Sequence, residues 1–485
     1  MRLGVVLYNM GKIPLLLSVA MCLPDIYAVI YRAIDVLWSL LAAQGIMLAV
    51  GLAMVLGFKQ AKGLSLRYRE GFAMATFGWL LAAVLGAMPY LFSGLCTPVN
   101  AWFESMSGYS TTSMTILPAF ETIPRSLLIY RNLTHWLGGM GILVLLLMFM
   151  PGSSGAKIYK AEVPGNMVIE RATPKIGDVA RILWVTYVGM TALLCVLLLL
   201  CGLNFNDALC YAMAAISTGG FSNYSNGLMS FVDNAAVQWL LVVFMILAGG
   251  NFMFHYLSIV KRRNYFWRSE EFRVYLLMMF TAAALLAVSL FYNGTYAGES
   301  PAFVIRQAVF HVVSVMTTTG FYTVDYDIWP AFCRMLLFGL FFVGGCAGST
   351  SGSIKVSRLI IAFKSCIASL GKTLQPKLVT VVKLDKKVVS NETINAVTIF
   401  LLLYGFLLML GALVLSWQGL APFEAISVVM SALSNEGIGF GRFGPSGDLT
   451  LLTDFSKLFL SFYMMLGRLE VLTVMVLFTR FFWRK

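Results

Sequence analysis

The sequence has few charged residues, few histidines and no paired cysteines. Only 12% of its 485 residues are charged, whereas soluble domains average about 25%. The three histidines, His135, His255 and His311, are far apart, and none of the eight cysteines belongs to a Cys-x-x-Cys pair. The low charge excludes an ordinary soluble domain, and the spacing of His and Cys favours neither a zinc site nor a disulfide framework. With no Ser/His/Asp set or nucleotide motif either, we expect no enzyme activity and no organic cofactor.

Hydrophobic residues dominate instead, at 59% of the chain. The apolar runs are long enough to cross a hydrocarbon layer roughly 30 Å thick. The sequence therefore predicts an all-α integral membrane protein. The first 24 residues contain Arg2, Lys12 and an apolar stretch without a clear cleavage site, so we expect a retained helix rather than a signal peptide.

Basic and acidic residues are segregated along the chain. Of the 35 Lys and Arg, 22 lie in the stretches 58–70, 155–182, 261–273 and 355–387. Only Arg125, Arg306 and Arg442 lie in the alternating stretches 93–125, 203–235, 295–328 and 418–452, which carry ten Asp and Glu. Because Lys and Arg stay on the cytoplasmic side of membranes, the basic stretches and both termini are predicted to be cytoplasmic. This distribution argues against a nucleic-acid partner despite the net charge of +13, and an acidic outer face favours the approach of cations.

A short pattern recurs four times, each time between two long apolar stretches. A brief hydrophobic segment is followed by small hydroxyl residues and then by a glycine or serine. The four copies are Ser110, Thr111, Thr112, Ser113; Ser217, Thr218, Gly219, Gly220; Thr317, Thr318, Thr319, Gly320; and Ser434, Asn435, Glu436, Gly437. Their last positions are 107, 100 and 117 residues apart, a period far above that of solenoid repeats.

The hydrophobic segments before these copies are too short to cross a membrane and suit re-entrant helices. We therefore predict two leading transmembrane helices followed by four fused helix–pore-loop–helix repeats around one pore. The leading helices are expected at 13–32 and 35–57, and the repeats at 70–92, 99–109 and 126–150; 180–202, 205–216 and 234–260; 272–293, 302–316 and 330–364; and 392–418, 421–433 and 452–481. The corresponding divisions of the chain are 1–66, 67–152, 153–262 (with a cytosolic loop), 263–366 and 367–485 (with a cytosolic loop).

Non-helical loops at membrane depth are tolerated only where protein shields them or where they line water. Neutral carbonyl dipoles can replace the hydration shell of a cation and still release it. The four copies are therefore predicted to be a selectivity filter. The oxygens that we expect to coordinate the ion are the backbone carbonyls of Thr111, Thr112, Ser217, Thr218, Thr317, Thr318, Ser434 and Asn435.

The second helix of repeat three contains an unusual run from Gly344 to Ser353. Each glycine costs about 1 kcal/mol relative to alanine in a helix, so we predict a break beneath the filter. The residues of this predicted gate are Gly344, Gly345, Gly348, Ser349, Thr350 and Gly352, together with Arg468 of the last helix. Two alternatives stay open for the run: close helix packing through small residues, and a phosphate loop, whose lysine is out of place here.

Several segments resemble one known family. They are Phe103–Gly108, His135–Gly141, Thr319–Phe321, Gly344–Thr350 and Gly467–Val471. Over nearly the whole length the chain is similar to the TrkH branch of the Trk/Ktr/HKT cation transporters. The resemblance implies potassium uptake through a pore of the bacterial inner membrane, a homodimer, and gating by a cytosolic nucleotide-binding ring. It also implies that the gate run is an intramembrane gate and that Arg468 forms an electrostatic barrier below the filter; the alternative for Arg468 is a structural salt bridge.

Two filter positions depart from the family's pattern. Potassium-selective members usually end all four segments with glycine, whereas the first segment here ends in Ser113. Potassium is favoured, but weakly selective K⁺/Na⁺ or sodium conduction stays open. Glu436 precedes the last filter glycine, and it is interpreted as a solvated rim residue or as a source of negative field at the mouth.

Two further questions stay open. A proton- or sodium-coupled symporter is the alternative transport mechanism, although such carriers usually have acidic residues at the midplane and inverted repeats. The basic inner loops 151–178 and 365–390 are expected to dock either an acidic cytosolic partner or anionic membrane lipid.

Overall fold

In a computed structural model, the structure describes residues 1–483 except 65, 118, 142–175, 261, 263, 378 and 379. Six of its helices are long and apolar enough to cross a membrane, or up to eight if each of two bent pairs counts as one span. Residues 142–150 of the expected second helix of repeat one, and the boundary at 152, lie outside the described residues.

The first leading span begins earlier than predicted. It consists of α1 (Leu3–Met10), α2 (Lys12–Ala20) and α3 (Cys22–Ile30), and the second span is α4 (Ile34–Gly57). The prediction of a start at residue 13 was wrong because Lys12 is accommodated inside the span. Its ammonium group donates to Asn9 Oδ1 (3.1 Å) and lies 4.9 Å from the ring centroid of Tyr8.

The four repeats follow in sequence order. Repeat one contains α5 (Tyr68–Gly86), α6 (Met88–Phe92), α7 (Pro98–Tyr109) and α8 (Arg125–Gly139). Repeat two contains α11 (Ile176–Leu200), α12 (Phe205–Ile216), α13 (Ala235–Ala248) and α14 (Phe252–Val260). Repeat three contains α15 (Glu270–Tyr292), α16 (Pro301–Met316), α17 (Ala331–Leu340) and α18 (Val356–Leu374). A hairpin of β1 (Lys383–Leu384) and β2 (Lys387–Val388) precedes repeat four, which contains α19 (Asn391–Trp417), α20 (Pro422–Ser434), α21 (Asp454–Arg468), α22 (Leu472–Met475) and the terminal α23 (Arg480–Trp483).

The short pore helices α7, α12, α16 and α20 lie within one residue of their predicted bounds. Their starts are specified locally. Pro98, Pro301 and Pro422 occupy the first helical turn, where a missing N–H costs nothing. Thr97, Asn204 and Ser300 cap the first three of these helices by accepting a bond from a backbone N–H of the first turn.

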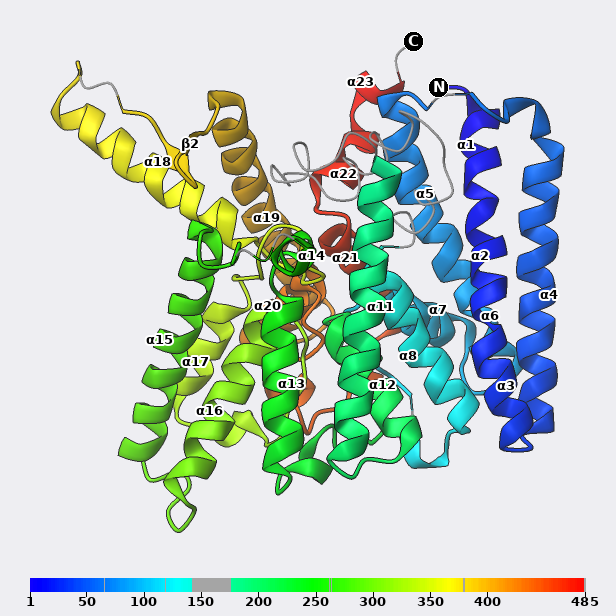
Figure 1. Cartoon of the computed structure of the whole chain (residues 1–485), viewed down its shortest axis with the longest axis horizontal. Helices are drawn as coiled ribbons and strands as arrows, with labels where there is room; N and C mark the ends of the chain where they lie inside the picture. Colours follow the sequence, from blue (N-terminus) through cyan, green and yellow to red (C-terminus); the bar gives the residue numbers. More distant parts are fainter. Residues whose placement is uncertain are drawn as a thin grey trace.

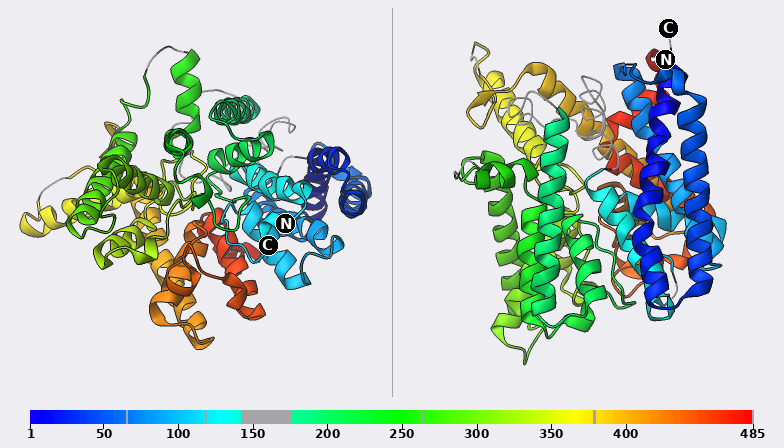
Figure 2. Two further views of the ribbon diagram at one scale, coloured as in Figure 1. Left: turned by 90° about the horizontal axis from the view of Figure 1, so that it is seen from below. Right: turned by 45° about the vertical axis from the view of Figure 1, so that its right-hand side comes forward.

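The repeats surround a common centre. Each pore helix packs against the first helix of its own repeat, and α7 packs on α21, α12 on α8 and α16 on α13. These contacts join repeats one and four, two and one, and three and two. Phe338 of α17 packs on Phe423 of α20 (ring centroids 5.5 Å apart) and so joins repeats three and four. Figure 2 (left) shows the four repeats around this centre, with the leading helices outside the ring.

Two of the predicted second helices are broken. The helix expected at 234–260 bends by 93° between α13 and α14, and the helix expected at 452–481 bends by 108° between α21 and α22. The first break contains Gly249, Gly250 and Asn251. At the second, Glu470 and Val471 take positive φ angles of 55° and 35°, which an α-helix does not contain. The mainly apolar composition of both segments favoured continuous helices, so neither break was predicted.

Both termini lie on the same side of the molecule as α18 and the β hairpin (Figure 1). Many apolar side chains on the outer faces of the long helices are exposed, among them Leu277, Phe280, Leu402 and Leu413. Exposed apolar surface of this kind suits contact with lipid.

Candidate ion filter and gate

The four predicted filter segments have the same backbone conformation. Their second positions have positive φ angles of 58° (Thr111), 52° (Thr218), 54° (Thr318) and 58° (Asn435). Their fourth positions also have positive φ, at 63° (Ser113), 83° (Gly220), 73° (Gly320) and 90° (Gly437). Positive φ is uncommon outside glycine, so its occurrence at eight corresponding positions identifies one structure repeated four times.

Each segment is tied back to the end of its own pore helix. The N–H of the third position donates to the carbonyl five residues earlier, at distances of 3.0 Å (Thr112 to Ser107), 2.9 Å (Gly219 to Ala214), 2.8 Å (Thr319 to Ser314) and 2.9 Å (Glu436 to Ser431). This bond closes a helix over a left-handed residue, as in a Schellman motif. The pore helix therefore determines how its filter segment leaves it.

The segments close into a ring through their third and fourth positions. A Cβ atom added to Gly220 would lie 1.6 Å from the carbonyl oxygen of Thr319. One on Gly320 would lie 2.1 Å from that of Glu436, and one on Gly437 would lie 2.0 Å from that of Thr112. Each closing glycine thus faces a carbonyl of the neighbouring segment, and no side chain fits between them.

Ser113 occupies the fourth closing position. Its hydroxyl donates to the carbonyl of Glu436 (3.5 Å) and lies 3.1 Å from the place that a Cβ on Gly320 would take. Together with Gly220, Gly320 and Gly437 it lines an outer cavity of about 210 Å³. The hydroxyl therefore lies where the ring opens to the outer side.

Glu436 is not a solvated rim residue. Its exposed fraction is 1%, and Oε2 has no hydrogen-bond partner among the described residues. That interpretation was wrong because the side chain is enclosed by protein, while its carbonyl faces Gly320. A negative field from Glu436 at the mouth stays a prediction.

A polar side chain of each pore helix supports the filter loop of its own repeat. Glu104 accepts from Thr115 Oγ1 (3.0 Å) and from Arg131 Nε (2.7 Å). The other supports are Asp207 with Asn223 (2.8 Å) and Tyr224 (2.7 Å), Gln307 with Thr323, and Glu424 with Arg442 (2.8 Å). Sequence analysis did not identify these supports, although two of them share a spacing of 16 residues that was a usable signal.

Arg131 also joins repeats one and two. Its guanidinium donates to the carbonyl of Ser222 (2.9 Å) and lies 3.3 Å from the ring centroid of Phe221. The ring of His135 also stacks on the ring of Phe221, with the two ring centroids 3.6 Å apart. Arg131 and Glu104 are almost fully buried, with side-chain exposures of 1% and 0%.

On the outer side, the loop that follows filter three meets the loop that follows filter four. Asp327 accepts a bond from the backbone N–H of Gly441 (3.0 Å). Burial, with a smaller contribution from the neighbouring Asp325, raises the pKa of Asp327 to about 6.

The predicted break in repeat three is present. Helix α17 ends at Leu340 and α18 begins at Val356, so residues 341–355 form a gate loop. The N–H of Gly352 donates to Thr318 Oγ1 (2.7 Å), and a Cβ on Gly352 would lie 2.2 Å from the carbonyl oxygen of Ser434. Thr350 Oγ1 donates to the carbonyl of Ile216 (3.1 Å), which precedes filter two. The loop thus lies directly against three filter segments.

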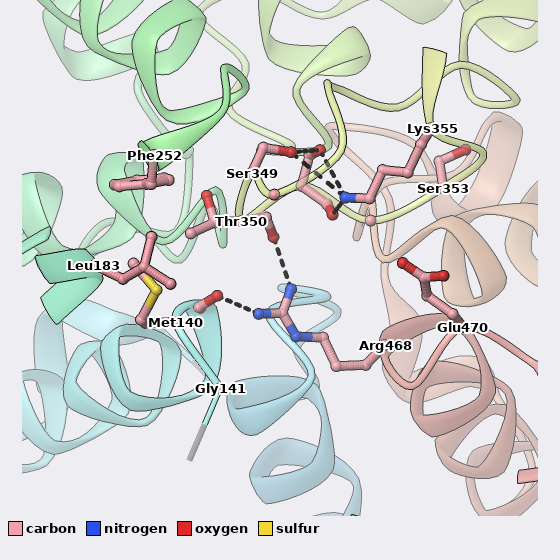
Figure 3. A pocket seen from close by; sticks show the side chains of 15 residues that line it. Met140, Gly141, Leu183, Phe252, Ser349, Thr350, Ser353, Lys355, Arg468 and Glu470 are labelled. Atoms are coloured by element: carbon pink, nitrogen blue, oxygen red, sulfur yellow. Dashed lines mark hydrogen bonds between the residues drawn. The ribbon is translucent and has the colours of Figure 1, made fainter. Parts of the chain in front are cut away.

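Arg468 lies beside the gate loop (Figure 3). Its guanidinium donates to the carbonyl of Thr350 (2.7 Å), to Thr111 Oγ1 (3.3 Å) and to the carbonyls of Gly138 (2.6 Å) and Gly139. These acceptors are backbone and hydroxyl oxygens. The nearby Glu470 forms its ion pair with Arg358. Arg468 therefore links the gate loop to filter one and to the end of α8.

The break in repeat two is joined to the gate loop. The N–H of Cys346 donates to the carbonyl of Gly249 (2.8 Å), and the N–H of Phe252 donates to that of Gly348 (3.1 Å). Gly345 packs so closely that an added Cβ would lie 2.5 Å from the oxygen of Gly249. The loop of repeat three is thus bonded to the break of repeat two, and the Gly249–Gly250–Asn251 run was the signal that sequence analysis missed.

The three histidines bind separate partners or pack apart from one another. His311 Nδ1 is 2.9 Å from the carbonyl of Gln307, and His255 Nε2 is 3.0 Å from that of Leu247. In the part of the chain that the structure describes, no group of three or more His, Cys, Asp and Glu could hold a metal ion.

Comparison with known proteins agrees with this architecture. The family model described as TrkH, a cation transport protein, matches residues 41–485. The chain is 33% identical over 481 residues to the Trk system potassium uptake protein TrkH of Escherichia coli K12, covering 98% of both chains. It is also 33% identical over 492 residues to the protein of the same name from Halomonas elongata, covering 100% of both. The crystal structure of the potassium transporter TrkH from Vibrio parahaemolyticus superimposes with a TM-score of 0.90 at 28% identity, over 100% of both chains.

Proposed function

We propose how this chain, which belongs to the TrkH family of cation transport proteins and takes up potassium, moves its ion. A potassium ion sheds its water in the outer cavity and enters the ring of filter segments. It is coordinated there by the backbone carbonyls of Thr111, Thr112, Ser217, Thr218, Thr317, Thr318, Ser434 and Asn435. The transport is channel-like, and the gate loop and Arg468 close the path below.

One observation carries this proposal: the left-handed pair of residues that recurs in all four segments. A fixed alternation of backbone conformation sets the direction of successive carbonyls. Four equal segments then surround an ion with neutral dipoles, which bind it firmly enough to replace water and weakly enough to release it.

Potassium is the favoured ion, and Ser113 is the observation that keeps weakly selective K⁺/Na⁺ or sodium conduction as the second candidate. Its hydroxyl lies near the closing residues of filters three and four. An extra oxygen at the mouth of the ring contacts a smaller ion at closer range than the carbonyls alone do. It therefore lowers the discrimination against sodium. The remaining segments end in glycine and present carbonyls alone.

Flux into proteoliposomes tests both ion and mechanism. We expect downhill potassium flux that continues when a protonophore is present, with potassium preferred over sodium. Ser113→Gly is expected to raise the K⁺/Na⁺ flux ratio a fewfold, since roughly 1 kcal/mol of differential binding corresponds to about a fivefold ratio. An unchanged ratio would contradict this role of Ser113, and flux that stops without a proton or sodium gradient would favour the symport alternative.

The gate belongs to the same proposal. The loop 341–355 lies against filters two, three and four, and Arg468 places a full positive charge beside it. A cation that leaves the filter therefore meets both a steric plug and a repulsive charge. Opening requires the loop to withdraw from Thr318 and Arg468 to leave the carbonyl of Thr350.

We place the chain in the bacterial inner membrane, with both termini and α18 in the cytoplasm, because the basic residues lie on that side. We also propose a homodimer and regulation by a cytosolic nucleotide-binding ring subunit. The relatives are named as parts of a Trk system. The hairpin and α18 present Lys372, Lys383, Lys386 and Lys387, which suit an acidic partner or anionic lipid headgroups.

A further inference from the structure

Glu271 joins the middle of the gate loop to the start of α18. Its Oε1 atom accepts the N–H of Ala347 (2.7 Å) near the start of the glycine-rich part and the N–H of Ser357 (3.1 Å) just beyond the end. Ser357 lies in the first turn of α18, so the carboxylate also faces the positive end of that helix. The residue is 7% exposed. A single buried carboxylate on α15 thus fixes one point within the loop and one point at the start of α18, ten residues further along the chain.

Lys355 holds the interior of the same loop (Figure 3). Its ammonium group donates to the carbonyl of Ser351 and lies 3.3 Å and 3.4 Å from the hydroxyls of Ser351 and Ser349. Ser351 Oγ in turn accepts the N–H of Gly345 (2.9 Å). Lys355 is also 7% exposed, and it lines the cavity of about 70 Å³ beneath the loop.

These contacts offset the loss of conformational entropy when the loop becomes ordered. It contains four glycines, at 344, 345, 348 and 352, and glycine loses more conformational freedom on ordering than any other residue. Buried charges are costly unless they are fully hydrogen-bonded. The hydrogen bonds that stabilise the buried charges of Glu271 and Lys355 are the same bonds that order the gate loop.

We propose that Glu271 and Lys355 are positioning residues that brace the gate loop in its closed position, so that loss of either charge opens the gate. The inference rests on the proposed gate. The hydrogen bonds of both side chains go to the gate loop and the start of α18, so the brace acts on how often the path opens and leaves ion choice unchanged.

The chain supplies a matched control at the same end of α15. Glu270 forms an ion pair with Lys364, and their side chains are 28% and 34% exposed. Their other contacts are with the hairpin: Glu270 with Asp385, and Lys364 with the carbonyl of Lys383 (2.8 Å). This pair has the same chemistry one position away and does not contact the gate loop.

The test measures basal potassium flux of the full chain in proteoliposomes without any partner protein. Glu271→Gln and Lys355→Met are expected to raise basal flux about tenfold, the effect of losing one hydrogen bond to a charged group. Glu270→Gln and Lys364→Met are expected to leave it unchanged. Lys355→Arg keeps the charge and is expected to keep basal flux low, while the K⁺/Na⁺ ratio stays constant in all five variants.

Thermal unfolding identifies the variants that fold, and deletion of 347–351 in the same assay separates the two proposals. If the deletion raises flux while folded Glu271→Gln and Lys355→Met do not, the brace is wrong and the gate stands. If the deletion does not raise flux, the gate itself is wrong and the brace fails with it. A rise in Glu270→Gln equal to that in Glu271→Gln would also overturn the brace, because the effect would then be general to this helix end.

Discussion

The four repeats have nearly the same backbone structure in the filter but different structures in the helices beneath it. In the filter, the second positions of the four segments agree within 6° in φ. Beneath it, α8 ends at Gly139, repeat two breaks over three residues, repeat three over fifteen, and repeat four turns at Leu469–Val471. The same sequence duplication thus yields near identity in one layer and divergence in the next.

The proposed roles of the filter and of the gate beneath it explain why the repeats are alike in one layer and different in the other. An ion at the centre of a ring needs equal oxygens on all sides, so each segment is constrained by the other three. A gate needs one element that can move against the others, and equality would work against that. Substitutions can test whether the filter is as intolerant, and the lower layer as adaptable, as this comparison implies.

Gly220→Ala should have the largest effect. Its Cβ would lie 1.6 Å from the carbonyl oxygen of Thr319, and a displaced carbonyl no longer coordinates the ion. We expect potassium flux to fall by roughly a thousandfold, since a residue at this φ and in this contact must distort the ring. Gly189→Ala, where no atom lies within 4 Å, is the control, and near-normal flux in Gly220→Ala would contradict the ring.

Arg131→Met tests the buried support of filter one. It leaves Glu104 charged and buried without its partner, so we expect unfolding free energy to fall by about 3–5 kcal/mol. The double variant with Glu104→Gln should recover most of this loss. Arg442→Met, in a pair whose arginine side chain is 57% exposed, should cost much less, because water screens an exposed ion pair. Equal losses in the two single variants, measured by denaturant unfolding, would show that burial does not distinguish these supports.

Arg468→Ala tests the lower layer. Removal of a positive charge from beside the path should raise potassium flux about tenfold, because a full charge at membrane depth is a strong barrier to a cation. Arg480→Ala, on the exposed terminal helix, should leave flux unchanged. A decrease in Arg468→Ala with normal thermal stability would indicate that the arginine holds the path open.

Asp327→Asn should have the smallest effect. A carboxyl group whose pKa is raised to about 6 binds a proton in the folded state that the unfolded chain has already released. Its contribution therefore makes the protein less stable as pH rises from about 4 to about 6. The asparagine variant should lose this slope and, at pH 8, gain at most about 1 kcal/mol after solvent screening. Thermal unfolding between pH 4 and pH 8 measures both, and a wild-type slope in the variant would assign the pH dependence to another group.

The elements that could be predicted from sequence are those with local causes. Pro98, Pro301 and Pro422 begin three pore helices, and the left-handed residues that follow all four helices explain why the filter segments were recognisable. The run Gly344–Ser353 indicated a break in the helix, because glycine and hydroxyl residues do not sustain an apolar helix. These features depend on neighbours within a few positions along the chain.

The breaks at Gly249–Asn251 and Leu469–Val471 were missed for the converse reason. Gly249 is held by Cys346, which is distant in sequence, and Val471 lies in a turn whose residues are mostly apolar. The position of Lys12 was missed although its partners Tyr8 and Asn9 are local, because a lysine was expected to lie outside the apolar span. The burial of Glu436 was missed likewise, since it depends on how a neighbouring repeat closes over it.

By itself, the sequence determined a membrane chain of two leading spans and four pore repeats, because hydropathy, charge placement and helix-ending residues act locally. Only the tertiary structure decided that Ser113 lies at the mouth of the ring, that the supports behind the filter are Glu104, Asp207, Gln307 and Glu424, and that Glu271 and Lys355 hold the gate loop. The contacts of Ser113 and Glu271 join residues far apart in the chain. The strength of all these contacts comes from burial and distance, which even the 16-residue spacing shared by two of the supports does not give.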